Sequence, residues 1–307
     1  MKAVFLGTSE FAIPSLRTLS RSEIKLQCVV TRPPRPAGRG KRLRQPPVYH
    51  AASELGLPVH QPVKLQEDFI EMLRSLEPDI MVAAAYGAWL PMELLDSSGL
   101  GVMNVHPSLL PLYRGAAPVA RAIMDGVQRT GVTFMLTDEG WDTGPVIASF
   151  PEPVAPGDTA GSLTERLAEK AAERIVPVIE EYSRGILRPV PQTGRSCYAE
   201  KISKQETWID WSRRAEEIER LVRALQPWPG ARTKLRGKMI KVVRASLLPH
   251  DLPPGEILPE DGGLTVGCGD SSSLRIEELQ PASKKVMQAQ DFLRGARLKP
   301  GDSFELP

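Results

Sequence analysis

Residues 101–115 have the sequence GVMNVHPSLLPLYRG, in which a short apolar run ends in polar residues and prolines. The apolar part, 101–105, has the length and composition of a buried β-strand. Asn104 and His106 stand two positions apart at its end, so strand geometry places both side chains on the same side of a sheet. The prolines that follow predict a rigid loop, because each proline fixes its own backbone angle φ.

Similar apolar runs lie on both sides of this stretch and alternate with amphipathic segments. We predict further strands at 2–6, 26–30, 79–84 and 132–136, and helices at 11–20, 71–76, 117–124 and 159–182. This alternation is typical of an α/β domain built on a parallel sheet. Such sheets bind ligands at the carboxyl ends of their strands, which is where Asn104 and His106 are expected. An NAD-dependent enzyme is not expected, because Gly7, Thr8 and Ser9 do not begin a G-x-G-x-x-G phosphate loop.

The pattern changes after Gly185. Prolines and a glycine between 188 and 195 indicate a connector. Beyond it we predict a helix at 215–225 and short strands at 239–243, 255–258, 263–266 and 274–279. Regularly spaced short strands of this kind predict a small β-barrel. We therefore divide the chain into an N-terminal domain, 1–188, a linker, 189–206, and a C-terminal domain, 207–307.

The composition excludes several classes of protein. Of the 307 residues, 41% are hydrophobic and 25% are charged, as in globular proteins. No apolar run approaches the roughly 18–20 residues of a membrane-spanning helix, and the apolar start of the chain is too short for a signal peptide. The three cysteines are far apart and match neither a disulfide framework nor a zinc site. We expect a monomer in the reducing cytoplasm that needs no membrane and no metal.

The charges are unevenly placed. Segments 32–44 and 232–244 each hold six basic residues and no acidic one, although the net charge of the chain is only +2. Such concentration indicates a local binding surface for a polyanion. The alternative for either segment alone is an ordinary solvated surface loop.

A third polar residue completes a set that suits acyl transfer to an amine. Asp142 lies in EGWDTG at 139–144, a turn-rich segment after the predicted strand 132–136. The substrate amine would itself be the nucleophile, while Asn104 and a protonated His106 stabilise the oxyanion. Asp142 would orient the imidazolium and pass protons. Taken alone, Asn104 and His106 are more typical of a polar strand end than of a catalytic site, and Asp142 is compatible with a simple turn. The spacing does not prove that the three residues meet.

Two motifs resemble a known family. NVHPSLLPLYRGAAP at 104–118, followed by EGWDTG, resembles the signature of the 10-formyltetrahydrofolate-dependent formyltransferases. The resemblance implies a Rossmann-like parallel-sheet domain, 10-formyltetrahydrofolate as formyl donor, and Asn104, His106 and Asp142 as the catalytic residues. The folate contacts that it implies are Tyr86, Gly87, Trp89, Leu90, Pro91, Ser108, Leu109, Leu110, Pro111 and Asp138.

Further stretches resemble one branch of that family, the enzymes that formylate initiator methionyl-tRNA for translation initiation. These stretches are GTSEFA at 7–12, TRPPRPAGRGKRL at 31–43, IDWS at 209–212, LQPWPGA at 225–231 and LQPASKKVMQAQDFL at 279–293. The resemblance implies an open OB-like barrel as C-terminal domain and initiator methionyl-tRNA as partner. The tRNA contacts that it implies are Arg35, Arg39, Lys41, Arg42, Arg232, Lys234, Lys238 and Lys241.

Other functions compatible with the same residues are kept open. A related enzyme could formylate a small amine, such as a nucleotide-linked amino sugar or glycinamide ribonucleotide, but such an acceptor needs neither the basic segments nor a second β-domain. A hydrolase could direct water instead of an amine onto the same donor. A non-catalytic RNA-binding module would not need the intact Asn104, His106 and Asp142.

Overall fold

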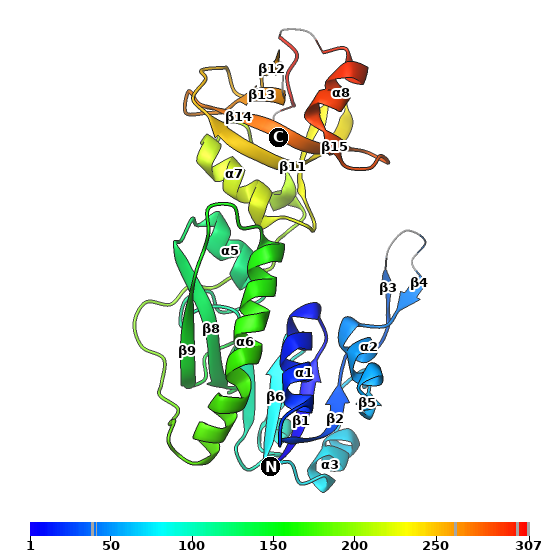
Figure 1. Cartoon of the computed structure of the whole chain (residues 1–307), viewed down its shortest axis with the longest axis vertical. Helices are drawn as coiled ribbons and strands as arrows, with labels where there is room; N and C mark the ends of the chain where they lie inside the picture. Colours follow the sequence, from blue (N-terminus) through cyan, green and yellow to red (C-terminus); the bar gives the residue numbers. More distant parts are fainter. Residues whose placement is uncertain (38–39, 41, 261–262, 299–300, 306–307) are drawn as a thin grey trace. The chain divides into compact units, whose positions relative to one another are not determined.

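The computed structural model describes residues 1–37, 40, 42–260, 263–298 and 301–305, and Figure 1 shows the elements along the chain. The chain folds into two compact units. Unit 1 comprises Met1–Pro118, Arg129–Pro153 and Thr164–Ala199, and unit 2 comprises Val119–Gln128, Val154–Leu163 and Glu200–Pro307. The residues 189–199, predicted to start a linker, therefore pack with unit 1. None of the helices in the described part of the chain has the length and apolar character needed to cross a bilayer.

Unit 1 is built on a seven-stranded sheet with the order β5-β2-β1-β6-β7-β8-β9. Its strands are β1 (Lys2–Gly7), β2 (Lys25–Val30), β5 (Val59–His60), β6 (Ile80–Ala84), β7 (Val102–His106), β8 (Arg129–Leu136) and β9 (Val146–Pro153). The first five in this order are parallel. This direction was predicted for β1, β2, β6 and β7, whereas the two-residue strand β5 was not predicted. β8 runs antiparallel to β7, and β9, which was not predicted, runs antiparallel to β8. The prediction of direction was wrong for β8 because an apolar pattern marks a buried strand without marking its direction.

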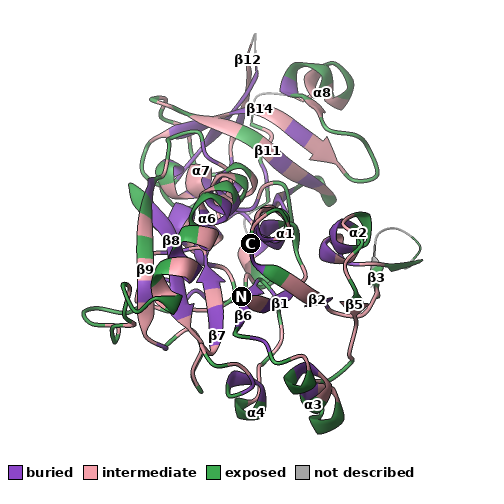
Figure 2. Ribbon diagram, turned by 60° about the horizontal axis from the view of Figure 1, so that its bottom comes forward, coloured by how far each residue is buried: buried purple, intermediate pink, exposed green. Residues whose placement is uncertain are grey.

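Helices cover both faces of this sheet. They are α1 (Ile13–Ser20), which continues the 3-10 turn η1 (Glu10–Ala12), α2 (Pro47–Glu54), α3 (Glu67–Ser75), α4 (Met92–Leu95) and α6 (Ala160–Ser183). Helix α5 (Pro118–Met124) belongs to unit 2 except for its first residue. Figure 2 shows α3 and α4 on one face and α1, α2 and α6 on the other. Ile70 and Leu73 of α3 pack with Val4, Leu6 and Met81 of the strands in one buried cluster. β1 and β6, inside the sheet, are accordingly buried along almost their whole length, as parallel strands covered on both faces are.

The longest helix matches its predicted period. Leu163, Leu167, Ala171 and Ile175 of α6 recur every four residues and are all fully buried. The predicted helices at 11–20, 117–124 and 159–182 are confirmed within about two residues, while α3 begins at Glu67, four positions before its predicted start. The short elements α2 and α4 were not predicted, because one or two turns carry too few apolar positions to show a period.

The first basic segment forms a small hairpin. β3 (Arg35–Ala37) pairs antiparallel with β4 (Arg42–Arg44), and Arg35 stands opposite Arg44. Neither strand was predicted, because each has only three residues and neither shows an apolar alternation.

Unit 2 contains an open antiparallel sheet. Its order is β10-β11-β14-β13-β12, with β15 also paired to β14, and within the described residues the first and last strands of the order do not pair. The elements are η2 (Gln205–Thr207), α7 (Ala215–Ala224), β10 (Ala231–Leu235), β11 (Lys238–Leu248), β12 (Ile257–Glu260), β13 (Gly263–Gly267), β14 (Ser273–Pro281), β15 (Met287–Gln288) and α8 (Ala289–Ala296). In the core, the Trp211 ring stacks on Phe304 with centroids 5.4 Å apart. The predicted helix 215–225 and the OB-like open sheet are confirmed; β10, β15 and α8 were not predicted.

Candidate active site

The end of β7 places two polar side chains against one carboxylate. Nδ2 of Asn104 donates a hydrogen bond of 3.2 Å to Oδ1 of Asp142. Nδ1 of His106 lies 3.6 Å from Oδ2 of the same carboxylate. Because both reach Asp142, the prediction that Asn104 and His106 point to one side of the sheet is confirmed. Asp142, which is distant in the sequence, thus meets the neighbouring residues Asn104 and His106 in unit 1.

Asp142 lies in the segment between β8 and β9, and this segment runs back along the sheet towards the end of β7. Since β8 is antiparallel to β7 and Leu136 stands opposite Met103, the chain leaves β8 beside the beginning of β7 and not beside its end. Asp142 itself has φ 53°, in the left-handed region that few residues other than glycine adopt. Asp138 closes the turn, because its Oδ1 accepts hydrogen bonds from Gly140 N (3.0 Å) and Thr143 Oγ1 (2.7 Å). The return of this segment brings the carboxylate to Asn104 and His106.

A backbone carbonyl determines which nitrogen of His106 faces the site. Nε2 lies 2.8 Å from the carbonyl oxygen of Tyr113. A carbonyl only accepts hydrogen bonds, so the hydrogen on this nitrogen is assigned from its partner. Nδ1 is then the nitrogen available to Asp142 and to a substrate. The imidazole is 4% exposed, so its orientation is set by the protein.

A glycine supplies a further donor to Asp142. Gly115 N donates a hydrogen bond of 2.8 Å to Oδ2 of the carboxylate. Gly115 has φ 106°, and a Cβ atom at this position would lie 3.0 Å from the carbonyl oxygen of Ala199 and from the Tyr198 ring. Glycine is therefore required both by the backbone conformation and by the space. The carboxylate of Asp142 is engaged from three sides, by Asn104, His106 and Gly115.

The loop after β7 is tied to β8 by buried hydrogen bonds. The hydroxyl of Ser108, a fully buried residue, donates to the carbonyl of Leu112 (2.6 Å). The Thr133 hydroxyl donates to the carbonyl of Ser108 (2.7 Å), and Leu110 N donates to that hydroxyl (3.2 Å). Ser108, predicted as a folate contact, is thus placed to shape the loop, which in turn holds Tyr113 behind His106.

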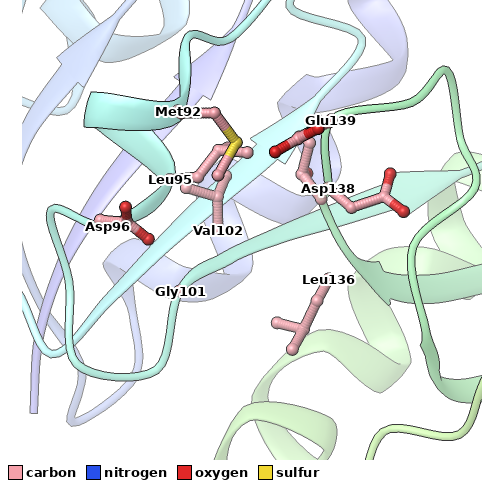
Figure 3. Close-up of a pocket in the computed structure, with 9 residues that line it drawn as sticks. Met92, Leu95, Asp96, Gly101, Val102, Leu136, Asp138 and Glu139 are labelled. Atoms are coloured by element: carbon pink, nitrogen blue, oxygen red, sulfur yellow. The ribbon is translucent and has the colours of Figure 1, made fainter.

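A cavity of about 460 Å³ lies between α4, the start of β7 and the end of β8. It is lined by Met92, Leu95, Asp96, Gly101, Val102, Leu136, Thr137, Asp138 and Glu139. Figure 3 shows Met92, Leu95 and Val102 on one side of it, with Leu136, Asp138 and Glu139 across. Of the predicted folate residues, Asp138 lines this cavity; Tyr86, Gly87, Trp89, Leu90, Pro91, Ser108, Leu109, Leu110 and Pro111 do not.

Two of the residues predicted around the folate have very different surroundings. Tyr86 is 4% exposed and belongs to the core beneath α3 and α4. Burial raises the pKa of its phenol, and the positive charge of Arg32 opposes that rise. Trp89 is half-exposed, and its ring lies edge to face with that of Trp141 at 5.1 Å between centroids. Trp89 therefore offers an accessible aromatic surface, whereas the Tyr86 ring does not.

The predicted tRNA contacts of unit 2 lie on β10 and β11. Arg232 stands opposite Lys241 across the ladder, and Lys234 shares their face because alternate residues of a strand point the same way. Lys238 stands opposite the buried Leu235 at the end of the hairpin, so it belongs to the other face. Three of the four cations are thus brought together and the fourth is separated from them.

In unit 1, Arg35 and Arg42 are exposed on β3 and β4. Arg39 and Lys41, predicted between these strands, lie outside the described residues.

Comparison with known proteins identifies the family. Residues 1–179 match the family model of formyl transferases, and residues 201–297 match that of the formyl transferase C-terminal domain. The chain belongs to the formyl transferase family. The family membership agrees with the polar cluster of β7 and Asp142, which lies within the first matched range.

Individual relatives match nearly the whole chain. A methionyl-tRNA formyltransferase of Thermodesulfovibrio yellowstonii is 41% identical over 303 residues, which cover 98% of this chain and 98% of the relative. Another, of Halorhodospira halophila, is 43% identical over 308 residues and covers 99% of both chains. Among solved structures, the N-formyltransferase of Helicobacter canadensis with folinic acid and dTDP-3-aminofucose gives a TM-score of 0.68 at 18% identity, covering 92% of this chain and 99% of that one. This last likeness concerns the fold alone.

Some residues at the site carried no signal in the sequence. The apolar lining of the cavity comes from Met92 and Leu95 of the single-turn helix α4 and from Val102 and Leu136 of the strands. In the sequence these residues cannot be told apart from ordinary core residues. Gln192, in the predicted connector, donates hydrogen bonds to the carbonyls of Asp142 (2.9 Å) and Gly144 (2.8 Å). A hydrophobic or charge pattern does not reveal such contacts, because they depend on the tertiary fold.

Proposed function

We propose that this protein transfers the formyl group of 10-formyltetrahydrofolate to the α-amino group of methionine on initiator tRNA. The observation that carries the chemistry is the convergence of Asn104 and His106 on the carboxylate of Asp142. The acceptor is supported by the near-full-length similarity to methionyl-tRNA formyltransferases. We further propose 1–188 as the catalytic domain, 189–206 as linker and 207–307 as the tRNA-binding domain.

Asn104 and His106 are the proposed donors to the formyl oxygen, which gains negative charge as the amine adds to the carbonyl carbon. One hydrogen of the Asn104 amide is used by Asp142, so the second remains for that oxygen. On His106 the donor is Nδ1, because Nε2 is held by the Tyr113 carbonyl. When Nδ1 is protonated, the Asp142 carboxylate 3.6 Å away balances its charge.

Asp142 is the proposed carrier of the proton that must move. The attacking nitrogen loses a proton as its bond to the formyl carbon forms, and the carboxylate accepts it directly or through one water. As the bond between the formyl carbon and the donor nitrogen breaks, that nitrogen gains a proton, which Asp142 returns. The products are the formylated amine and tetrahydrofolate, and no electrons are exchanged with a third reactant.

The cavity beside β7 fits the bicyclic ring of a folate in size and chemistry. Its volume of about 460 Å³ lies within the range of small-molecule sites. Met92 and Val102 offer apolar contact for a flat ring, and the carboxylates of Asp138 and Glu139 can accept hydrogen bonds from its N–H groups. The exposed rings of Trp89 and Trp141 form an aromatic pair of their own, and neither ring lines this cavity.

The face of β10 and β11 that holds Arg232 and Lys241 is the proposed contact for tRNA phosphates in unit 2. Burial lowers the pKa of Lys241, and the neighbouring charge of Arg232 lowers it further. The buried Nε of Arg232 has no hydrogen-bond partner within the described part of the chain. A phosphate would neutralise both cations, and release of counterions from RNA would contribute to the affinity. The exposed Arg35 and Arg42 of the hairpin, with Arg39 and Lys41, form the proposed contact in unit 1.

A turnover assay tests the proposal. Purified protein is incubated with 10-formyltetrahydrofolate and one acceptor: charged initiator methionyl-tRNA, free methionine, an amino-sugar nucleotide, or none. Formylation that requires the charged tRNA is the expected result. Consumption of the donor without any acceptor would instead favour a hydrolase, and formylation of the amino sugar would favour a small-amine enzyme. RNA binding without any consumption of the donor would contradict catalysis altogether.

A further inference from the structure

The segment 190–199, part of the predicted linker 189–206, is attached to both loops that form the candidate active site. At one end Val190 exchanges two backbone hydrogen bonds of 2.8 Å with Val146, just beyond the Asp142 turn. At the other end Arg114 N donates to the carbonyl of Cys197 (3.1 Å), and Ala199 N donates to the carbonyl of Arg114 (2.6 Å). Gln192 lies between these two attachments, so its backbone position is defined from both sides.

The side-chain amide of Gln192 uses every polar group it has. Its Nε2 donates to the carbonyls of Asp142 (2.9 Å) and Gly144 (2.8 Å). Its Oε1 accepts from Nε (3.0 Å) and Nη2 (2.7 Å) of Arg114. The reverse orientation would set the amide hydrogens against guanidinium hydrogens and the oxygen against two carbonyls, so the partners determine which way the amide faces.

This one amide links the two sides of the Asp142 carboxylate. On one side it holds the backbone of Asp142, whose φ of 53° is costly for an aspartate and persists only where surrounding contacts maintain it. On the other side it holds Arg114, the residue directly before Gly115, and Gly115 N donates to the carboxylate itself. The turn that presents Asp142 and the loop that receives it are therefore connected through Gln192.

We infer that Gln192 is a positioning residue for the reaction: it holds the Asp142 carboxylate at the correct distance from Asn104 and His106. It touches no reacting atom and acts through the backbone of Asp142 and through Arg114. This inference rests on the proposed function, because it assigns Gln192 to the same proton-transfer group.

Two replacements with side chains about as long as that of glutamine test the donor and the acceptor of the Gln192 amide separately. Gln192→Glu keeps an acceptor for Arg114 but places an oxygen against two carbonyls, and Gln192→Met removes both donors and acceptor while leaving Arg114 charged. A displacement of about 1 Å at a reacting group costs about a hundredfold in rate, so each variant is expected to lower kcat about ten- to a hundredfold. KM for the folate donor and for tRNA should stay within about threefold of wild type, because ground-state contacts are unchanged.

Coupling to Asp142 distinguishes positioning from a general weakening of the fold. Asp142→Asn is expected to lower kcat on its own, and adding Gln192→Met to it should lower kcat by less than about a further twofold. Losses that multiply would overturn the inference, because they would show that Gln192 acts independently of Asp142. Unchanged kcat in both single variants, or a loss confined to Gln192→Glu, would overturn it as well.

The controls keep the outcome interpretable. Thr193→Ala, an exposed neighbour in the same segment, should match wild type in kcat. Melting temperatures identify a variant that fails to fold, in which case the other replacement of Gln192 decides. If wild type does not formylate charged tRNA, the proposed function fails, and the same comparison is made with whichever acceptor or water supports turnover of the donor. If wild type is active and the Gln192 variants equal it, only the inference fails.

Discussion

His106 is held by one nitrogen and presents the other to the site, so its removal should affect catalysis far more than binding. We expect His106→Ala to lower kcat by at least about a hundredfold, the usual loss for a donor to a developing oxyanion. The affinity for tRNA should stay near that of wild type, because the replaced imidazole is 4% exposed and lies among residues of unit 1. Single-turnover kinetics and a tRNA binding titration measure the two quantities separately.

His50→Ala is the matched control, since His50 is exposed on α2. Wild-type kcat in His106→Ala would remove this residue from the mechanism.

At the scale of single residues, the sequence revealed those site residues that lie within a continuous motif. Asn104 and His106 lie in one long motif, and period two alone aligned their side chains. Asp142 was recognisable from its own short motif. The path of the segment that carries Asp142 back along the sheet was not, because it follows from the antiparallel direction of β8. Gln192 had no signal, because its partners are carbonyls that the fold brings to it.

At the scale of elements, an ion pair between α5 and η2 gives unit 2 a definite response to acid. Arg121 Nη1 donates to the Glu206 carboxylate, which also accepts from Ser203 N (2.8 Å). The bond from Arg121 is the main reason that the pKa of Glu206 is lowered to about 2 from an ordinary 4.5. A depressed folded-state pKa contributes stability that is present above about pH 4.5 and is lost as the pH falls towards 2.

Glu206→Gln should therefore lower the midpoint of denaturant unfolding at pH 7, and the difference from wild type should shrink below pH 4.5. Unfolding curves between pH 7 and about pH 3 measure it. Glu23→Gln, an exposed carboxylate without an ion pair within the described residues, serves as control. A difference that stays constant down to the lowest pH would contradict the assignment to Glu206.

The hairpin of β3 and β4 is an element whose cations should affect only the RNA substrate. Arg42→Ala and Arg39→Ala are each expected to raise KM for tRNA about fivefold, the effect of about 1 kcal/mol, and to leave KM for the folate donor unchanged. Initial rates with one substrate varied at a time measure both constants. Arg21→Ala, an exposed arginine at the end of α1, should change neither. An unchanged dependence on tRNA would remove the hairpin from the interface.

Strand and helix positions in unit 1 followed from apolar periodicity, and they were most accurate where the elements are long and buried, as in α6. Elements of one or two turns, such as α4, and strands of three residues, such as β3 and β4, are too short to show a period. The sequence also did not predict strand direction correctly. The predicted helix between the strands at 101–105 and 132–136 suggested a parallel crossover, but β8 is antiparallel to β7.

At the scale of the whole molecule, cations in the two units should contribute to tRNA binding independently. Arg42→Ala and Lys241→Ala lie in different units, so their effects on log KM should add in the double variant. Each removed phosphate contact should also reduce the salt dependence of log (kcat/KM) by about 1 unit of slope. Rates over a series of KCl concentrations test this. If Lys241→Ala changes neither KM for tRNA nor the salt dependence, this face of β10 and β11 does not contact the RNA.

The division into an α/β part and a β-rich part was foreseen from the change of pattern after Gly185. The interlacing of the units was not: Val119–Gln128 and Val154–Leu163 belong to unit 2, although they precede the predicted linker. Composition and periodicity describe local segments, whereas membership of a unit depends on which distant segments pack together. The sequence predicted Asn104, His106 and Asp142, which the fold brings together, and it did not predict the apolar residues that line the cavity.

All the side chains that converge on Asp142 belong to unit 1, whereas the cations of β10 and β11 belong to unit 2. For the evolution of such a chain, this separation lets selection act on the two parts independently. On the proposed function, a mutation on the face of β10 and β11 would change RNA binding without replacing any group that contacts Asp142. Duplicated genes could then diverge in the acceptor that this face contacts while they keep the same reacting groups.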